Sequence, residues 1–447
     1  MFQANLPVAL PKSVGNYGRF ATSSAPNAAI APLGPAPLGL TGAPAASLQP
    51  ASKPGFFASL IAWLERLFAP SAPQPSPLPV PQPVPPPAPP VTPAPAPTPS
   101  SGPGAIQAYF TDTYLGTNSG LSSADVRARN QASAQADPNN PDQRLVQLID
   151  SVPAGGTLDG AFFDIEVPDV VNALCQAAQR GVQVRMVTEN DYYHAPNSTA
   201  VRAPIAQLQS AGVQVLPDDR SGLMHDKFLV ANGQTVWTGS YNITDGGTYG
   251  DNNDAVQIQS PQLAAIYEQE FQKMFAGNFG DATAASAHPA PQTVDVGGAQ
   301  VTAYFSPNSS DSQGPKAAIM QALAGAQKSI KFMGYSYTDK DMGNLMLQKA
   351  QSGVDVQGVF EKDEAGSSYS QYHALKNAGL DVREDTNPAL MHHKVIIVDD
   401  STLILGSFNF SSSAQHSNDE NMLVIKNDPQ LVAAYEAEYA RMQQLSA

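Results

Sequence analysis

The chain has almost no cysteine, few basic residues and no long hydrophobic run. Cys175 is the only cysteine among 447 residues, which excludes an intrachain disulfide and a cysteine-based zinc site. Lysine and arginine number 24 against 39 acidic residues, and the net charge of -15 disfavours nonspecific binding to polyanions. No apolar run approaches the roughly 18 residues of a membrane-spanning helix, and residues 1–11 lack the features of an ordinary signal peptide. We therefore expect a soluble protein, either cytoplasmic or exported by another route.

Proline, which is abundant overall, is concentrated before residue 104. Of 40 prolines, 16 fall within residues 71–103, where few side chains could bury enough area to offset the entropy of ordering. We expect residues 1–103 to form a disordered Pro- and Ala-rich tail. Within the tail, apolar side chains recur at helical spacing near residues 56–68, which predicts a short amphipathic helix. That helix would either dock on a membrane surface or partner, or fold back onto the rest of the chain.

Beyond residue 103, short β-branched runs alternate with helical stretches. The alternation predicts an α/β body with a mixed central sheet flanked by helices. A proline at position 168 suits the first turn of a helix. The predicted strands are residues 182–187, 213–216, 228–230 and 236–238, and the predicted helices are residues 168–179 and 203–210.

The second part of this body repeats the first. Residues 224–232 align with residues 391–399 at an offset of 167, and the same offset places 239–242 on 406–409 and 253–254 on 420–421. A fixed internal period of this kind indicates tandem copies of one structural unit. We expect two domains, residues 104–284 and 298–447, packed about a pseudo-twofold axis as a bilobal body.

Each copy places the same four polar side chains on one hairpin. Side chains alternate along a strand, so His225 and Lys227 share a face, as do His392 and Lys394. His393 is turned to the opposite face, and we leave it out of the site. A Gly-Ser-x-Asn segment ends the second strand of each hairpin and adds a hydroxyl and a carboxamide to the same patch, at Ser240, Asn242, Ser407 and Asn409.

Two such patches facing each other would suit a phosphodiester. Lysine, serine and asparagine can donate hydrogen bonds to the nonbridging oxygens, and one histidine would lie on each side of the phosphorus. One histidine would attack as the nucleophile and the other would protonate the leaving oxygen. A metal site formed by His392, His393 and Glu420 is the alternative, but the paired lysines fit a phosphate better than a cation.

These motifs resemble those of the phospholipase D superfamily. The family pattern is His-x-Lys, four residues, Asp, six residues and Gly-Ser-x-Asn, and residues 392–409 match it in full, with Asp399 as the aspartate. The resemblance covers roughly residues 104–447. It implies one site shared by two halves, a phosphohistidine intermediate, no metal or other cofactor, and hydrolysis of a phosphodiester or its transfer to an alcohol.

The two copies differ at two positions. Asn232 stands where the family has aspartate, and because that residue supports the hairpin in the family, we expect activity to survive the change. The family places a partner of the histidine ring at Asn253 and Glu420, and we expect each to contact the histidine of its own copy. A carboxylate beside His392 would favour its protonated form, which predicts His225 as the nucleophile and His392 as the general acid.

Three functions follow from this site. The first is phospholipase D-type hydrolysis of glycerophospholipids at a membrane surface, which gives phosphatidic acid and a free head group and which the acidic body favours. The second is a nuclease acting on DNA or RNA. The third is an inactive module that binds lipid or a partner. We expect a monomer, because both motifs lie in one chain.

Overall fold

The computed structural model describes residues 105–111, 121–280 and 287–446. These residues lie within one compact unit, Thr92–Ala447. The predicted disordered tail and its amphipathic helix near residues 56–68 lie outside the described residues.

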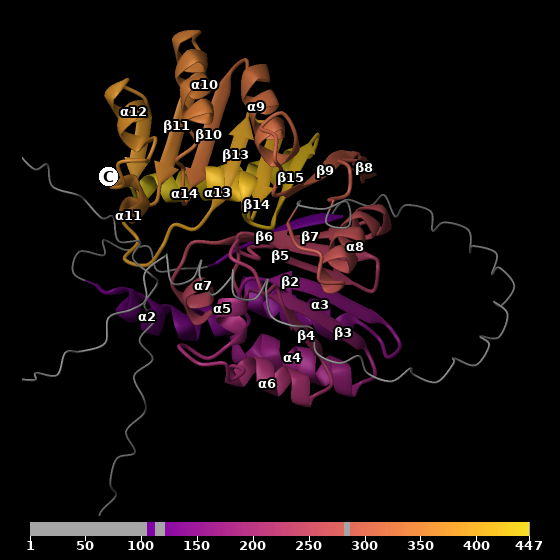
Figure 1. Ribbon diagram of the computed structural model, residues 1–447. Coiled ribbons are helices and arrows are strands. Elements are labelled where there is room, and N and C mark those ends of the chain that lie inside the picture. The colour runs from indigo at the N-terminus through magenta and orange to yellow at the C-terminus, as the bar shows by residue number, and fades with distance from the viewer. Residues whose placement is uncertain (1–104, 112–120, 281–286, 447) are drawn as a thin grey trace, which may run out of the picture. The chain divides into compact units, whose positions relative to one another are not determined.

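The first half is built on a seven-stranded mixed sheet with the order β1-β7-β6-β5-β2-β3-β4 (Figure 1). Strands β2, β3 and β4 run parallel, whereas β5, β6, β7 and β1 pair antiparallel to their neighbours. The strands are β1 (Ile106–Phe110), β2 (Thr157–Phe162), β3 (Gln183–Thr188), β4 (Gln214–Pro217), β5 (Lys227–Ala231), β6 (Thr235–Gly239) and β7 (Asp254–Gln259). Its helices are α2 (Ser123–Ala136), α3 (Pro141–Ser151), α4 (Pro168–Gln179), α5 (Asn190–Tyr193), α6 (Ala203–Ser210), α7 (Asp245–Tyr249) and α8 (Pro261–Phe275).

The second half repeats this sheet with one added edge strand. Its order is β12-β11-β10-β13-β14-β15-β9-β8, so that β9 to β15 without the added β8 correspond one by one to β1 to β7. The strands are β8 (Thr293–Val296), β9 (Ala299–Ser306), β10 (Ser329–Gly334), β11 (Asp355–Phe360), β12 (Asp381–Glu384), β13 (Lys394–Val398), β14 (Thr402–Gly406) and β15 (Glu420–Lys426). The helices are α9 (Gly314–Gly325), α10 (Lys340–Gln351), α11 (Lys362–Ala365), α12 (Tyr372–Asn377), α13 (Ser412–His416) and α14 (Pro429–Gln444).

The prediction of two copies of a helix-flanked mixed sheet is confirmed. Helices α4 and α6 have the predicted bounds, and the four predicted strands differ from β3, β4, β5 and β6 by one residue at each end. The second sheet begins earlier than the predicted domain start at residue 298, because β8 pairs with β9 from Thr293 onward.

Two equivalent helices lie between the sheets and join the halves. α8 and α14 each begin with a proline after a capping residue, Ser260 or Asp428, whose side chain accepts a backbone N–H of the first turn. The largest apolar cluster combines side chains of both helices with the facing strands of both sheets, including Tyr267, Phe305 and Tyr435. Separate clusters lie under the outer helices of each half. The two halves therefore share one core as well as one interface.

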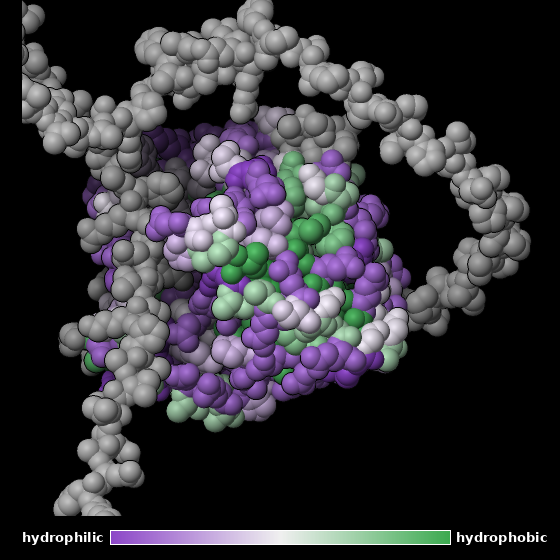
Figure 2. Space-filling model, turned by 60° about the horizontal axis from the view of Figure 1, so that its bottom comes forward, coloured by the Kyte–Doolittle hydropathy of each residue, from purple (hydrophilic) through white to green (hydrophobic). Residues whose placement is uncertain are grey.

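The surface turned toward the viewer in Figure 2 mixes hydrophobic and hydrophilic residues. Large apolar side chains that are exposed in the described part of the chain are Leu216, Leu223 and Tyr369. Among the described helices, none combines the length and the hydrophobicity required to cross a bilayer.

Candidate active site

Two short backbone bridges bring the His-x-Lys motifs together. Met224 pairs with Asp419, and Met391 pairs with Asn252, both in parallel. The bridges are closed by the amides of His225 and His392, which donate to the carbonyls of Asp419 and Asn252 at 2.9 Å in both cases. Each motif therefore lies beside the segment that leads into β7 or β15 of the other half. This exchange is symmetric, as the duplicated sequence requires.

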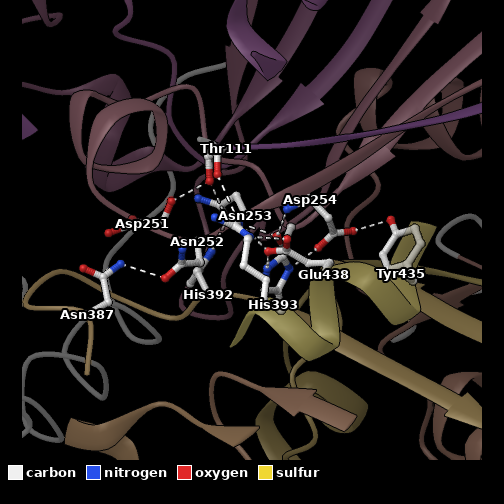
Figure 3. Close-up of polar contacts among 12 residues, drawn as sticks. Thr111, Asp251, Asn252, Asn253, Asp254, Asn387, His392, His393, Tyr435 and Glu438 are labelled. Atoms are coloured by element: carbon white, nitrogen blue, oxygen red, sulfur yellow. Dashed lines mark hydrogen bonds and ion pairs between the residues drawn. The ribbon is translucent and has the colours of Figure 1, made fainter. Parts of the chain in front are cut away.

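The exchange gives each histidine a partner from the opposite half. His225 Nδ1 lies 2.7 Å from Glu420 Oε2. His392 Nδ1 lies 2.9 Å from Asn253 Oδ1, as Figure 3 shows. The prediction that each partner serves its own copy is therefore wrong. The physical reason is that the backbone bridges hold each histidine beside the strand of the other half that begins at or just after the partner residue. In both rings the Nδ1 atom is occupied, which leaves Nε2 for a substrate.

The serines of Gly-Ser-x-Asn hold these partner side chains in place. Ser240 Oγ donates to Asn253 Oδ1 at 3.0 Å, and Ser407 Oγ donates to Glu420 Oε2 at 2.7 Å. Both serines are buried. They act on the histidines indirectly, through Asn253 and Glu420, whereas the sequence analysis expected them to donate to the phosphate oxygens.

The asparagines of the same segments have unused hydrogen-bonding capacity. Within the described residues, the Oδ1 atoms of Asn242 and Asn409 are buried and have no hydrogen-bond partner. A buried polar atom without a partner is costly. A site that receives a polar ligand can offset this cost when it is filled.

Each lysine lies next to its own histidine and close to the other lysine. Lys227 Nζ donates to the carbonyl of His225, and Lys394 Nζ to that of His392, both at 2.7 Å. Burial lowers the pKa of Lys227 to about 7, and burial together with the nearby charge of Lys227 lowers the pKa of Lys394 far from its usual range. An anion placed between the two ammonium groups would reverse both shifts.

The two histidines are also driven toward their neutral forms. Burial lowers the pKa of His225 to about 4, against the opposing charge of Glu420. Burial and then the two lysines lower the pKa of His392 well below its usual value. The site residues therefore carry less positive charge than their types suggest, and a bound phosphate would favour their protonated forms.

An aromatic side chain adjoins each histidine, which sequence reasoning missed. Phe163 meets the His225 ring edge to face with centroids 5.1 Å apart, and Tyr335 meets His392 in the same way at 4.7 Å. Lys227 Nζ lies 5.2 Å from the centre of the Phe163 ring, a cation–π contact. The available signal was position, since these aromatics follow β2 and β10, the strands that pair with the motif strands.

The aspartate position of the family pattern, Asn232 in the first copy and Asp399 in the second, lies at the opposite end of the hairpin. Asn232 and Asp399 both adopt a positive φ of 53° in the turn, a conformation that asparagine and aspartate tolerate. The Asp399 carboxylate accepts the backbone N–H groups of Gln327, Lys328 and Ser329. These contacts support the hairpin. No group of His, Cys, Asp and Glu within the described ranges is arranged to hold a metal ion.

Comparisons with known proteins match both halves. The family model described as "Cardiolipin synthase, PLD-like domain" matches residues 145–275 and 319–443. A mitochondrial cardiolipin hydrolase of Chlamydomonas reinhardtii is 31% identical over 124 residues, 28% of this chain and 55% of that protein. A phospholipase D of Rickettsia typhi is 34% identical over 117 residues, 26% of this chain and 57% of that protein. The chain thus spans little more than half the length of these curated relatives.

Among solved structures, the phosphatidylserine synthase of Haemophilus influenzae is similar across both halves. The match has a TM-score of 0.54 and 15% sequence identity, and it covers 76% of this chain and 87% of that chain. At this level of identity the likeness shows a common fold.

Proposed function

Because this chain belongs to the phospholipase D superfamily, we propose that it is a phosphodiesterase that acts through a phosphohistidine. The observation that carries the proposal is the pairing of two buried His-x-Lys motifs across the halves, with both Nδ1 atoms bonded and two lysines alongside. Such a site can bind an anionic phosphodiester and offer one imidazole on each side of the phosphorus.

In the proposed reaction His225 is the nucleophile. Its Nδ1–H donates to Glu420, so the lone pair of Nε2 attacks phosphorus while the opposite P–O bond breaks. His392 gives its Nε2 proton to the leaving oxygen. The phosphorylated imidazole is positively charged, and the Glu420 carboxylate compensates this charge in the intermediate. Water then attacks phosphorus, loses a proton to His392, and releases His225.

The role of His225 agrees with the sequence prediction, but the reason is different. The prediction relied on an amide partner that keeps this ring neutral at rest. With a carboxylate partner, burial keeps the free ring neutral, and the carboxylate favours the covalent form, in which the ring must be charged.

We propose glycerophospholipids as the substrates, with phosphatidic acid and a free head group as products. Two observations support a lipid over a nucleic acid. The relatives above are named cardiolipin hydrolase and phospholipase D, and residues 104–447 carry a net charge of -18, which repels a polyanion.

The first experiment measures turnover by the full chain in excess EDTA. Vesicles of phosphatidylcholine or cardiolipin and a single-stranded oligonucleotide are compared for the unmodified protein, His225→Ala and His392→Ala, with the exposed His373→Ala as a control. We expect lipid cleavage that both site variants lose and the control keeps. Cleavage of the oligonucleotide alone would make the protein a nuclease, and loss of activity in EDTA would exclude the metal-free mechanism. Binding without turnover would favour the inactive module.

A second experiment distinguishes the two histidines. Bis(4-nitrophenyl) phosphate has a leaving group that needs no proton, so His392→Ala should release one equivalent of nitrophenolate per chain and then stop. His225→Ala should show no burst. The opposite pattern would exchange the two roles.

A further inference from the structure

His393 lies between the two catalytic residues of the second motif but faces away from the site. Its side chain is fully buried. Nδ1 lies 3.0 Å from Asp254 Oδ1 on β7 of the first half, and Nε2 lies 3.0 Å from Glu438 Oε1 on α14 (Figure 3). A neutral imidazole has one N–H, so only an imidazolium can donate to both carboxylates.

The surroundings of His393 balance its charge. Arg441 donates to both oxygens of Glu438 at 2.6 and 2.7 Å, and Tyr435 donates its hydroxyl to Asp254 Oδ2 at 2.9 Å. Two carboxylates, one guanidinium and one imidazolium sum to zero, so loss of the imidazolium proton would leave one uncompensated buried charge. Although burial acts in the opposite direction, the bonds to Asp254 and Glu438 raise the pKa of His393.

The contacts of His393 adjoin those of the general acid. Two consecutive histidines, His392 and His393, bind two consecutive side chains of the other half, Asn253 and Asp254. The backbone of Asn253 is further held by Thr111, whose Oγ1 accepts its N–H at 2.8 Å. A shift of Asp254 would therefore move Asn253 and change the orientation of the His392 ring.

In the described part of the first half, no imidazole lies between two carboxylates at the equivalent position, and Glu270 of α8, the counterpart of Glu438, pairs with Lys273 and His288 instead. Asp226 occupies the position of His393 and Asn421 that of Asp254. Both carboxylate oxygens of Asp226 are buried without a hydrogen-bond partner among the described residues, while Asn421 binds the Lys227 amide and Thr238. The ion pair thus belongs to the side of the site that holds His392.

We propose that His393 is a positioning residue, a permanently charged imidazolium that holds Asn253 and thereby keeps His392 oriented for proton transfer. The part concerning His392 rests on the proposed function. The groups that contact the His393 ring are Asp254 from β7, Glu438 from α14 and the Phe110 ring from β1. Tyr435 and Arg441, both from α14, bond the two carboxylates in turn.

The catalytic test compares leaving groups that need the acid to different degrees. Methyl phenyl phosphate and methyl 4-nitrophenyl phosphate differ only in the nitro group. Phenolate is the poorer leaving group, so its departure depends more on protonation by a general acid. In single-turnover measurements, His393→Gln should slow the phenyl ester by about 100-fold and the nitrophenyl ester several-fold at most. Equal slowing of both esters would indicate a general structural defect and overturn the proposal. His416→Gln, which removes an exposed histidine paired with Asp311, is the matched control.

A second test does not require activity. In the full chain labelled with 15N-histidine, the His393 signals, assigned by their loss in His393→Gln, should show both ring nitrogens protonated at pH 8. A neutral His393 ring would refute the proposal whether or not either ester is cleaved.

If His393→Gln folds poorly, the double variant His393→Gln/Asp254→Asn provides a further test. It removes one charge of each sign, so it should recover thermal stability but not the rate with the phenyl ester. If the NMR signals show an imidazolium at His393 but the unmodified protein cleaves neither ester, the result would count against the proposed function and not against the charge state of His393.

Discussion

Replacement of Glu420 by glutamine tests whether its carboxylate stabilises the proposed phosphohistidine. Glu420 is fully buried, and its Oε2 contacts His225 Nδ1 and Ser407 Oγ, both at 2.7 Å. Asn418 Nδ2 donates to Oε1 at 3.1 Å. A glutamine has the same shape and can still accept the Nδ1–H with its Oε1, so the tautomer of His225 is preserved while the charge is lost. Its NH2 group then faces Asn418 Nδ2, and the hydrogen bond from Asn418 is lost as well.

The expected loss follows from the charge on phosphorylated His225. Opposite charges about 4 Å apart interact by about 4 kcal/mol at an effective dielectric constant near 20. Since about 1.4 kcal/mol corresponds to a tenfold change in rate, formation of the intermediate should slow by up to about 1000-fold. The dissociation constant of the substrate, taken from the concentration dependence of the burst rate, should change little, because the free ring is neutral with either partner.

The assay is the burst of nitrophenolate from bis(4-nitrophenyl) phosphate, which reports the first chemical step. Glu436→Gln is the control, because Glu436 on α14 makes an ion pair with Lys331 on β10 and not with a His-x-Lys residue. A burst rate of Glu420→Gln within about threefold of the unmodified protein would show that the carboxylate charge does not stabilise the intermediate. The roles of His225 and His392 would then need to be assigned again.

Three further outcomes are expected. Because burial lowers the pKa of Lys227 to about 7, kcat/KM should fall as pH rises through about 7. The value of kcat, which reports the anion-bound site, should fall only at higher pH. Parallel pH profiles of kcat and kcat/KM would contradict this. Lys227→Met should abolish turnover. It should also raise the thermal midpoint at pH 6 by about 2 °C or more, because a buried group whose pKa is lowered destabilises the fold when it is protonated. A lower midpoint measured by calorimetry would contradict this expectation. Asp399→Ala should lower the free energy of unfolding by about 2 kcal/mol in urea titrations and leave kcat nearly unchanged. Asn232→Ala should lower the free energy of unfolding by a smaller amount.

The sequence was sufficient to predict the hairpins and the face that His and Lys share on each of them. Strand alternation places His225 and Lys227 on one face, and the repeat predicts the same for the second copy. The partners of the histidines could not be predicted, because Glu420 and Asn253 are assigned by the bridges at Met224 and Met391, which join segments far apart in the chain. Local periodicity contains no information about such a register.

His393 shows a related limit of sequence reasoning. Strand alternation predicts that the His393 side chain points away from His392 and Lys394, and the structure has it on that opposite face. What lies on the opposite face depends on α14 and β7, whose packing is a tertiary property. A residue outside the reactive patch can therefore still determine its geometry.

The exchange of partners between the halves makes the two repeats unlike and mutually dependent. A first half paired with a second copy of itself would give both catalytic histidines an amide, and two second halves would give both a carboxylate. Only the unlike pair supplies one of each. Under the proposed roles of His225 and His392 the two repeats are therefore not interchangeable, and a single chain that contains both supplies them in equal number.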